Sequence, residues 1–114
     1  MHHAGPAKAD IVAALRRALG RGLGDRTVSG EELARRLSMH RRTLNRRLEA
    51  EGTTFREVLD AVRYKRACEL LRNPNLSIAD ISPRLGYGEP SAFSRAFRRW
   101  SGMTPLQWRA RRGG

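Results

Sequence analysis

Arg42, Asn45 and Arg46 stand three and four residues apart, so on a helix they would share one face. A guanidinium can donate two hydrogen bonds to a phosphate or to guanine O6 and N7, and a carboxamide can pair with adenine N6 and N7. The chain carries 23 Lys and Arg against 11 Asp and Glu, a formal net charge of +12. Because a fold does not need that excess, it indicates a polyanionic partner. The alternative interpretation of the three residues is a solvated basic face.

Other kinds of chemistry lack the residues they need. The sequence has no Ser, His and Asp arrangement, no carboxylate pair on an apolar face and no Gly-rich loop after a strand, so we predict no enzyme and no cofactor. His2 and His3 have no third ligand nearby, so no metal site is predicted. Cys68 is the only cysteine, which excludes an intrachain disulfide and suits a reducing cytoplasm. No apolar run approaches membrane-spanning length.

Apolar residues recur at helical spacing along the chain, and strand-like alternation is poor. The sequence therefore predicts an all-α fold of about seven helices, with the first ending at Leu19 before a glycine-rich break. An acidic residue stands three positions after each of Ser29, Thr54 and Ser77, as a capping box requires. Pro90 suits the first position of a helix. The expected helices begin near residues 7, 29, 41, 54, 77, 89 and 104.

The chain also repeats itself at an offset of about 48 residues. Cap and core positions of 29–37 recur in 77–85, and one extra residue in the second turn then shifts the register. Each copy is a helix, a short turn and a helix, which is the helix-turn-helix pattern. The later correspondences pair Leu44, Arg46, Leu48, Gly52 and Thr54 with Phe93, Arg95, Phe97, Gly102 and Thr104.

The second helix of such a motif enters the major groove of DNA. The helix expected at 54–72 would be roughly 28 Å long at about 1.5 Å per residue. Because successive major grooves lie roughly 34 Å apart, one chain could read two of them. We set residues 1–6 aside as a tail or tag remnant. The rest, 7–114, is interpreted as a DNA-binding domain with a first subdomain at 7–52, a linker helix at 53–73 and a second subdomain at 74–114.

Four short segments of the sequence are specific enough to compare with known families. Residues 52–55 read GTTF, and 85–87, 89–97 and 102–109 read LGY, EPSAFSRAF and GMTPLQWR. These segments resemble the AraC/XylS family of bacterial transcription regulators, in which GTTF is like the entry into the long helix. The match covers about Thr27 to Arg109. The resemblance implies a double helix-turn-helix domain that binds duplex DNA in the cytoplasm, at the nucleoid.

The resemblance also implies roles for individual residues. Base contacts would fall on the two recognition helices, at Arg42, Asn45, Arg46, Ser91, Ser94 and Arg95. Phosphate contacts would come from flanking arginines and from helix starts, where open N–H groups favour anions. These phosphate candidates are Arg41, Arg47, Thr53, Thr54, Arg98, Arg99 and Thr104.

Two departures from the family pattern fall in the second motif. Pro83 lies inside the fifth expected helix, where proline removes a backbone donor and clashes with the preceding turn. Ser82 stands where the family usually has alanine. The hypothesis is that a kink here weakens or re-aims the second motif. The aromatic residues Phe55, Phe93, Phe97, Trp100 and Trp108 are all interpreted as core.

Two other functions remain open at this point. A nonspecific architectural or RNA-binding protein would use charge alone and would show a steep salt dependence. A protein-interaction domain could use the apolar first helix and the glycines after it. The family usually carries a separate sensing or dimerising domain, which this chain lacks, and it makes RNA polymerase a candidate partner.

Overall fold

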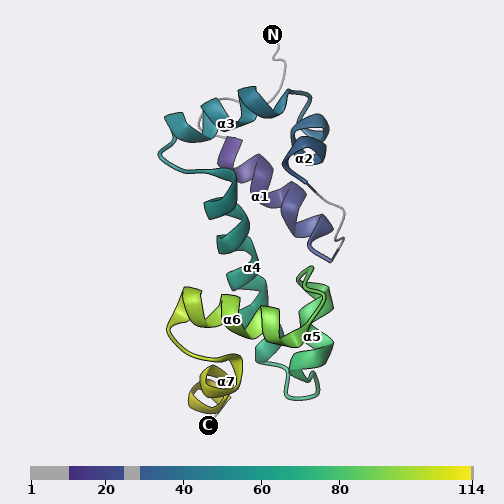
Figure 1. Cartoon of the computed structure of the whole chain (residues 1–114), viewed down its shortest axis with the longest axis vertical. Coiled ribbons are helices and arrows are strands. Elements are labelled where there is room, and N and C mark those ends of the chain that lie inside the picture. Colours follow the sequence, from purple (N-terminus) through teal and green to yellow (C-terminus); the bar gives the residue numbers. More distant parts are fainter. Residues whose placement is uncertain (1–10, 25–28, 114) are drawn as a thin grey trace. The chain divides into compact units, whose positions relative to one another are not determined.

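The computed structural model describes residues 11–24 and 29–113, and this part of the chain contains seven helices and no strand (Figure 1). The prediction of an all-α fold is confirmed. The described residues divide into two compact units, 11–22 with 29–62, and 23–24 with 63–113. The boundary falls inside the long helix α4 (Phe55–Leu71), between Val62 and Arg63. Each unit contains one helix-turn-helix motif.

The first unit contains α1 (Ile11–Gly22), α2 (Gly30–Arg36), α3 (Arg41–Ala50) and the start of α4. Its core is aliphatic and draws one face from each helix. The fully buried members include Ile11, Leu15, Leu33, Leu44 and Leu48. Burial of leucine and isoleucine at this spacing stabilises three short helices that would be marginal alone.

Helix α1 continues to Gly22, so the predicted end at Leu19 is wrong. Gly20 is exposed, and a glycine in a helix costs only about 1 kcal/mol relative to alanine. Ala18 and Leu19 are buried in the same turn and offset that cost. The predicted start near residue 7 lies outside the described residues.

The second unit contains the end of α4, α5 (Ile78–Arg84), α6 (Pro90–Ser101) and α7 (Pro105–Gly113). Its core is aromatic: Phe93 and Phe97 are fully buried, and Phe97 meets Trp108 edge-on with ring centroids 6.0 Å apart. The interpretation as core therefore holds for these three residues. Phe55 and Trp100 are only half-buried, so for them it was too strong.

The predicted N-caps start the helices as expected. Ser77 and Asp80 form a complete capping box, and so do Thr54 and Glu57. Ser29 Oγ accepts from the Glu32 amide at 3.2 Å, but the Glu32 carboxylate turns to Arg35 and Arg36 instead of closing a box.

The turns of the two motifs have the same backbone hydrogen bonds. Leu37 and Met39 donate to the carbonyl of Ala34, just as Leu85 and Tyr87 donate to that of Ser82. The left-handed residue of each turn is also equivalent, Ser38 with φ 62° and Gly86 with φ 88°.

Helix α5 continues through Pro83, and the matching turn that follows counts against the hypothesis that this proline distorts the second motif. Pro83 is exposed near the end of the helix. The buried Ser82 hydroxyl is satisfied because it donates to the carbonyl of Ile78 at 2.9 Å.

Candidate nucleic-acid interface

The outer face of α3 carries the first group of predicted base readers. Leu44 and Leu48 are buried on the inner face, which leaves Arg42, Asn45 and Arg46 exposed together on the other. Within the described part of the chain, neither Arg42 nor Arg46 has a hydrogen-bond or ion-pair partner. Two free guanidiniums on one helical face can donate to phosphate or to guanine.

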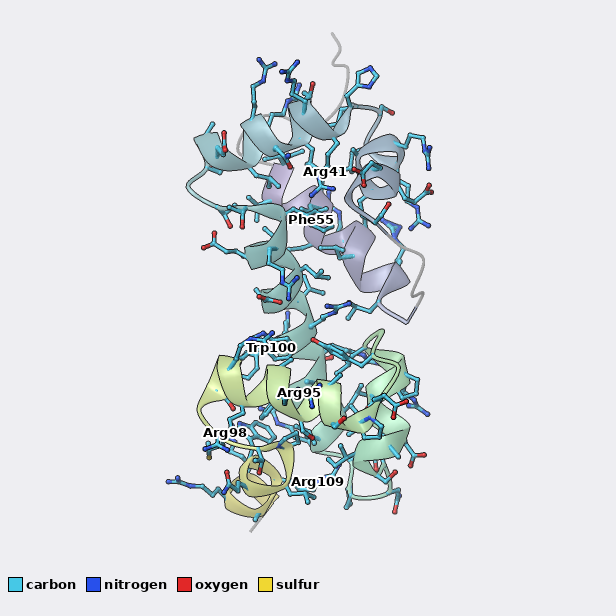
Figure 2. The ribbon with its side chains drawn as sticks, in the orientation of Figure 1. Arg41, Phe55, Arg95, Arg98, Trp100 and Arg109 are labelled. Carbon is cyan, nitrogen blue, oxygen red and sulfur yellow. The ribbon has the colours of Figure 1, made fainter. Side chains whose placement is uncertain are left out.

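Helix α6 presents an equivalent face in the second unit. Its buried side is Phe93, Ala96 and Phe97. Ser91 and Arg95 are exposed opposite it and Ser94 is half-buried beside them. Arg98 and Arg99 are also exposed, and Arg98 continues the stripe of Ser91 and Arg95 at helical spacing. Figure 2 shows Arg95 and Arg98 on this helix.

Arg41, a predicted phosphate contact, is engaged within the first unit. Its guanidinium carbon lies 4.9 Å from the ring centre of Phe55, and its Nη1 lies 3.3 Å from Glu31 Oε1 (Figure 2). Its Nε donates to Asn45 Oδ1 at 3.1 Å. A Cβ added to the buried Gly30 would lie 1.7 Å from Arg41 Nη1, so only glycine leaves room for this arrangement.

Arg47 also differs from the free arginines of its helix. It is half-buried and already interacts within the chain. Its side chain would have to exchange that interaction for one with phosphate.

The N–H groups of the three predicted threonines are engaged within the chain, not open as expected. Thr53 donates to the Leu48 carbonyl at 3.0 Å and Thr54 donates to Glu57 Oε1 at 3.1 Å. Thr104 donates to Gln107 Oε1 at 3.0 Å. Thr54 and Thr104 therefore act first as N-caps, and the Thr53 amide satisfies a carbonyl near the end of α3.

The remaining first-turn amides are the better anion donors. Of the four N–H groups at the start of α4, the capping box takes the first and last, which leaves Phe55 and Arg56. At α7 only Leu106 is left, because Pro105 has no N–H and the cap pair takes the other two. The helix dipole adds partial positive charge at both places.

A basic pocket in the second unit was not identified from the sequence. It encloses about 550 Å³ between the end of α4 and α7, and is lined by Leu71, Arg72, Pro74, Trp108, Arg109, Arg111 and Arg112. Arg72 and Arg112 lie over the Trp108 ring, at 6.0 and 5.3 Å from its centre. Arg109 donates to the carbonyls of Leu71 and Asn73, so it closes the end of α4. Arg109 lies 38 and 36 positions after these two partners, and contacts over such separations produce no periodic pattern in the sequence.

Acidic residues perturb the faces little. The Arg35 hydrogen bond lowers the pKa of Glu32, which therefore stays ionised and neutralises its neighbours on α2. Glu49 is exposed on α3, at the position where α6 has Arg98. The described residues contain no group of three potential metal ligands, and none of their helices is long and apolar enough to cross a membrane.

Comparison with known proteins gives matches over most of the chain. A family model described as a helix-turn-helix domain matches residues 33–111. An HTH-type transcriptional regulator of Mycobacterium tuberculosis H37Rv is 50% identical over 82 residues, which are 72% of this chain and 24% of that protein. The chain therefore spans only about a quarter of that relative's length.

Solved structures agree on the fold. A DNA-binding transcriptional dual regulator from Escherichia coli K-12 has a TM-score of 0.82 at 25% identity, over 89% of this chain and 96% of that one. The DNA-binding domain of AdpA, a global transcriptional factor in complex with a target DNA, has a TM-score of 0.74 at 29% identity, over 87% and 89%. The resemblance inferred from the sequence motifs is confirmed.

Proposed function

Because this chain belongs to the AraC-type family of helix-turn-helix domains, we propose that it binds duplex DNA at specific sequences and regulates bacterial transcription. The observation that carries this proposal is the exposed outer face of α3, where Arg42 and Arg46 are free of partners within the described residues. Charge alone would explain affinity for DNA, but free arginines flanking an asparagine on one recognition helix favour base readout.

The proposed base readers are Arg42, Asn45 and Arg46 of α3, and Ser91, Ser94 and Arg95 of α6. Arginine binds guanine with two hydrogen bonds, each such pair giving about 1–3 kcal/mol of discrimination. Serine hydroxyls can donate or accept, so they discriminate less.

Phosphate contacts position the domain without reading sequence. Arg98 and Arg99 are the first candidates, because both are exposed in the last turns of α6. The first-turn amides of α4 and α7, next to Thr53, Thr54 and Thr104, would hold further phosphates. Arg41 and Arg47 would contribute mainly through their charge, since both are engaged within the chain.

The two motifs are proposed to occupy successive major grooves, roughly 34 Å apart along DNA. The chain spans about a quarter of its relative's length. We therefore propose that sensing, dimerisation and contact with RNA polymerase are activities of a longer regulator that contains this domain. Activity in the cytoplasm follows from the same proposal.

Selection from a random duplex DNA pool at near-physiological salt tests the proposal first. We expect an enriched motif with two blocks centred about 10 base pairs apart. No enrichment, together with binding that is lost steeply as salt rises, would instead establish nonspecific binding by charge.

Two substitutions then separate the proposed roles. Arg46→Ala should cost about 1–3 kcal/mol on the selected site and relax one base position. Arg98→Ala should weaken binding to all sequences alike. It should also lower the slope of log affinity against log salt concentration by about 0.9, so the loss of affinity between 50 and 200 mM salt becomes about 3.5-fold smaller. Arg16→Ala, an exposed arginine of α1, is the control for loss of one charge. Equal effects of Arg46→Ala on every sequence would contradict base reading by α3.

A further inference from the structure

We propose that Arg41 is a positioning residue that determines which base Asn45 prefers. It would hold the Asn45 carboxamide with its oxygen toward the protein and its amino group toward DNA. The inference rests on the proposed DNA binding and adds to it a specificity rule for one base pair.

Arg41 is held in place from three sides. The Gly30 backbone leaves the space that its guanidinium fills, since a Cβ there would lie 1.7 Å from Nη1. The Phe55 ring lies 4.9 Å from the guanidinium carbon, and a cation–π contact of this kind is attractive. Glu31 pairs with Nη1 at 3.3 Å, and the side chain is 34% exposed. Arg41 is therefore less free than its neighbours on α3.

The restrained guanidinium leaves Asn45 only one orientation for this contact. Arg41 Nε carries a hydrogen and can only donate, so the group 3.1 Å away must be the carboxamide oxygen. Asn45 is exposed on the same face as Arg42 and Arg46. Its amino group, with two donors, is then the part left for a base edge.

This orientation changes the base that Asn45 would read. A free asparagine suits adenine, because its oxygen accepts from N6 while its amino group donates to N7. With the oxygen turned toward Arg41, the adenine N6 donor has no good acceptor. Guanine presents two acceptors, O6 and N7, and both suit the outward amino group. We therefore expect guanine at the position that Asn45 contacts.

The second motif has no equivalent of the Arg41–Asn45 hydrogen bond among its described residues. Helical register places Pro90 at the position of Arg41 and Ser94 at that of Asn45. Proline has no donor to offer, and a hydroxyl can rotate to donate or accept. The preference is thus expected only in the half-site of the first motif.

Arg41→Met is the test, since the thioether keeps an apolar stem against Phe55 and removes the Nε donor. Base preferences of the variant and the parent are measured by selection from the same random pool. At the Asn45-dependent position, guanine should lose roughly 3- to 10-fold against adenine, while other positions stay unchanged. Asn45→Ala identifies that position, and in its background Arg41→Met should change nothing there.

Glu31→Gln is the matched control, because it removes the ion pair and leaves the Nε contact. It should keep the preference for guanine. An unchanged preference in a folded Arg41→Met protein, or adenine at this position in the parent, overturns the inference. If Arg41→Met fails to fold by circular dichroism, Arg41→Leu, which also has no donor for the Asn45 oxygen, is measured in the same way. No enriched sequence for the parent itself would count against DNA reading as a whole.

Discussion

Gly86→Ala should destabilise the second unit strongly, because the backbone at this position is left-handed and a neighbouring backbone atom leaves no room for a side chain. Its φ is 88°, in the left-handed region, and an added Cβ would lie 2.7 Å from the Leu23 carbonyl oxygen. A left-handed conformation costs an ordinary residue about 1–2 kcal/mol. A backbone atom in the way adds about 1–3 kcal/mol for the forced shift.

Alanine also restricts the unfolded chain, which offsets about 0.5–1 kcal/mol of that cost. The net expectation is a loss of about 1–4.5 kcal/mol in the free energy of unfolding. The assay is urea unfolding followed by tryptophan fluorescence. Both tryptophans, Trp100 and Trp108, lie in the second unit, so fluorescence reports on that unit.

Ser38 is the matched position in the first motif, with φ 62° and an exposed side chain. Ser38→Gly relieves the left-handed cost but adds chain entropy, so it should stabilise the first unit by up to about 1 kcal/mol. Circular dichroism, which follows helices of both units, measures this change. A Gly86→Ala protein with the parent's fluorescence midpoint, or a Ser38→Gly protein less stable than the parent, would refute the reasoning.

Two further expectations concern protonation. The Ser77 amide donates to the Asp80 carboxylate at 2.9 Å and lowers its pKa. The stabilisation is therefore present above the unfolded pKa near 3.8 and is lost as the pH falls through the lower pKa of the folded state. Below about pH 4 the urea midpoint of the parent should fall with pH, and Asp80→Asn should make that fall shallower. An equally steep fall in Asp80→Asn would contradict this. Burial raises the pKa of the Cys68 thiol, so at pH 8 iodoacetamide should alkylate the folded chain more slowly than the chain in urea, as mass spectrometry would record; equal rates would show an accessible thiolate.

Local patterns predicted most of this fold because the interactions that produce them are local. The Ser77–Asp80 box closes over three residues, and the inward leucines of α3 follow from helical spacing. The same spacing predicts that Arg42 and Arg46 lie on the outer face of α3, where both are exposed. The predicted end of α1 was wrong because one glycine inside a helix costs less than the burial of Ala18 and Leu19 in the same turn contributes.

The placement of the Arg41 side chain could not be predicted from the sequence for a different reason. Its partners are Gly30, Glu31 and Phe55, which lie 10 to 14 positions away and meet it only through tertiary packing. A basic residue at the start of a recognition helix suggests a phosphate contact, and only the space above Gly30 shows where the guanidinium goes. Pro83 leaves α5 and its following turn undistorted because it falls in the last turn of the helix, where few following hydrogen bonds depend on regular helical geometry.

Differences between the two copies indicate what each would contribute to DNA binding. The first recognition helix has an oriented asparagine between two free arginines, and Glu49 near its end would repel phosphate. In the second, a serine replaces the asparagine and Arg98 takes the place of Glu49. Directional donors select a base, whereas a cation at the end of a recognition helix attracts the backbone of any sequence. We therefore expect the half-site of the first motif to be the more strictly defined, and binding through the second to carry more of the salt dependence.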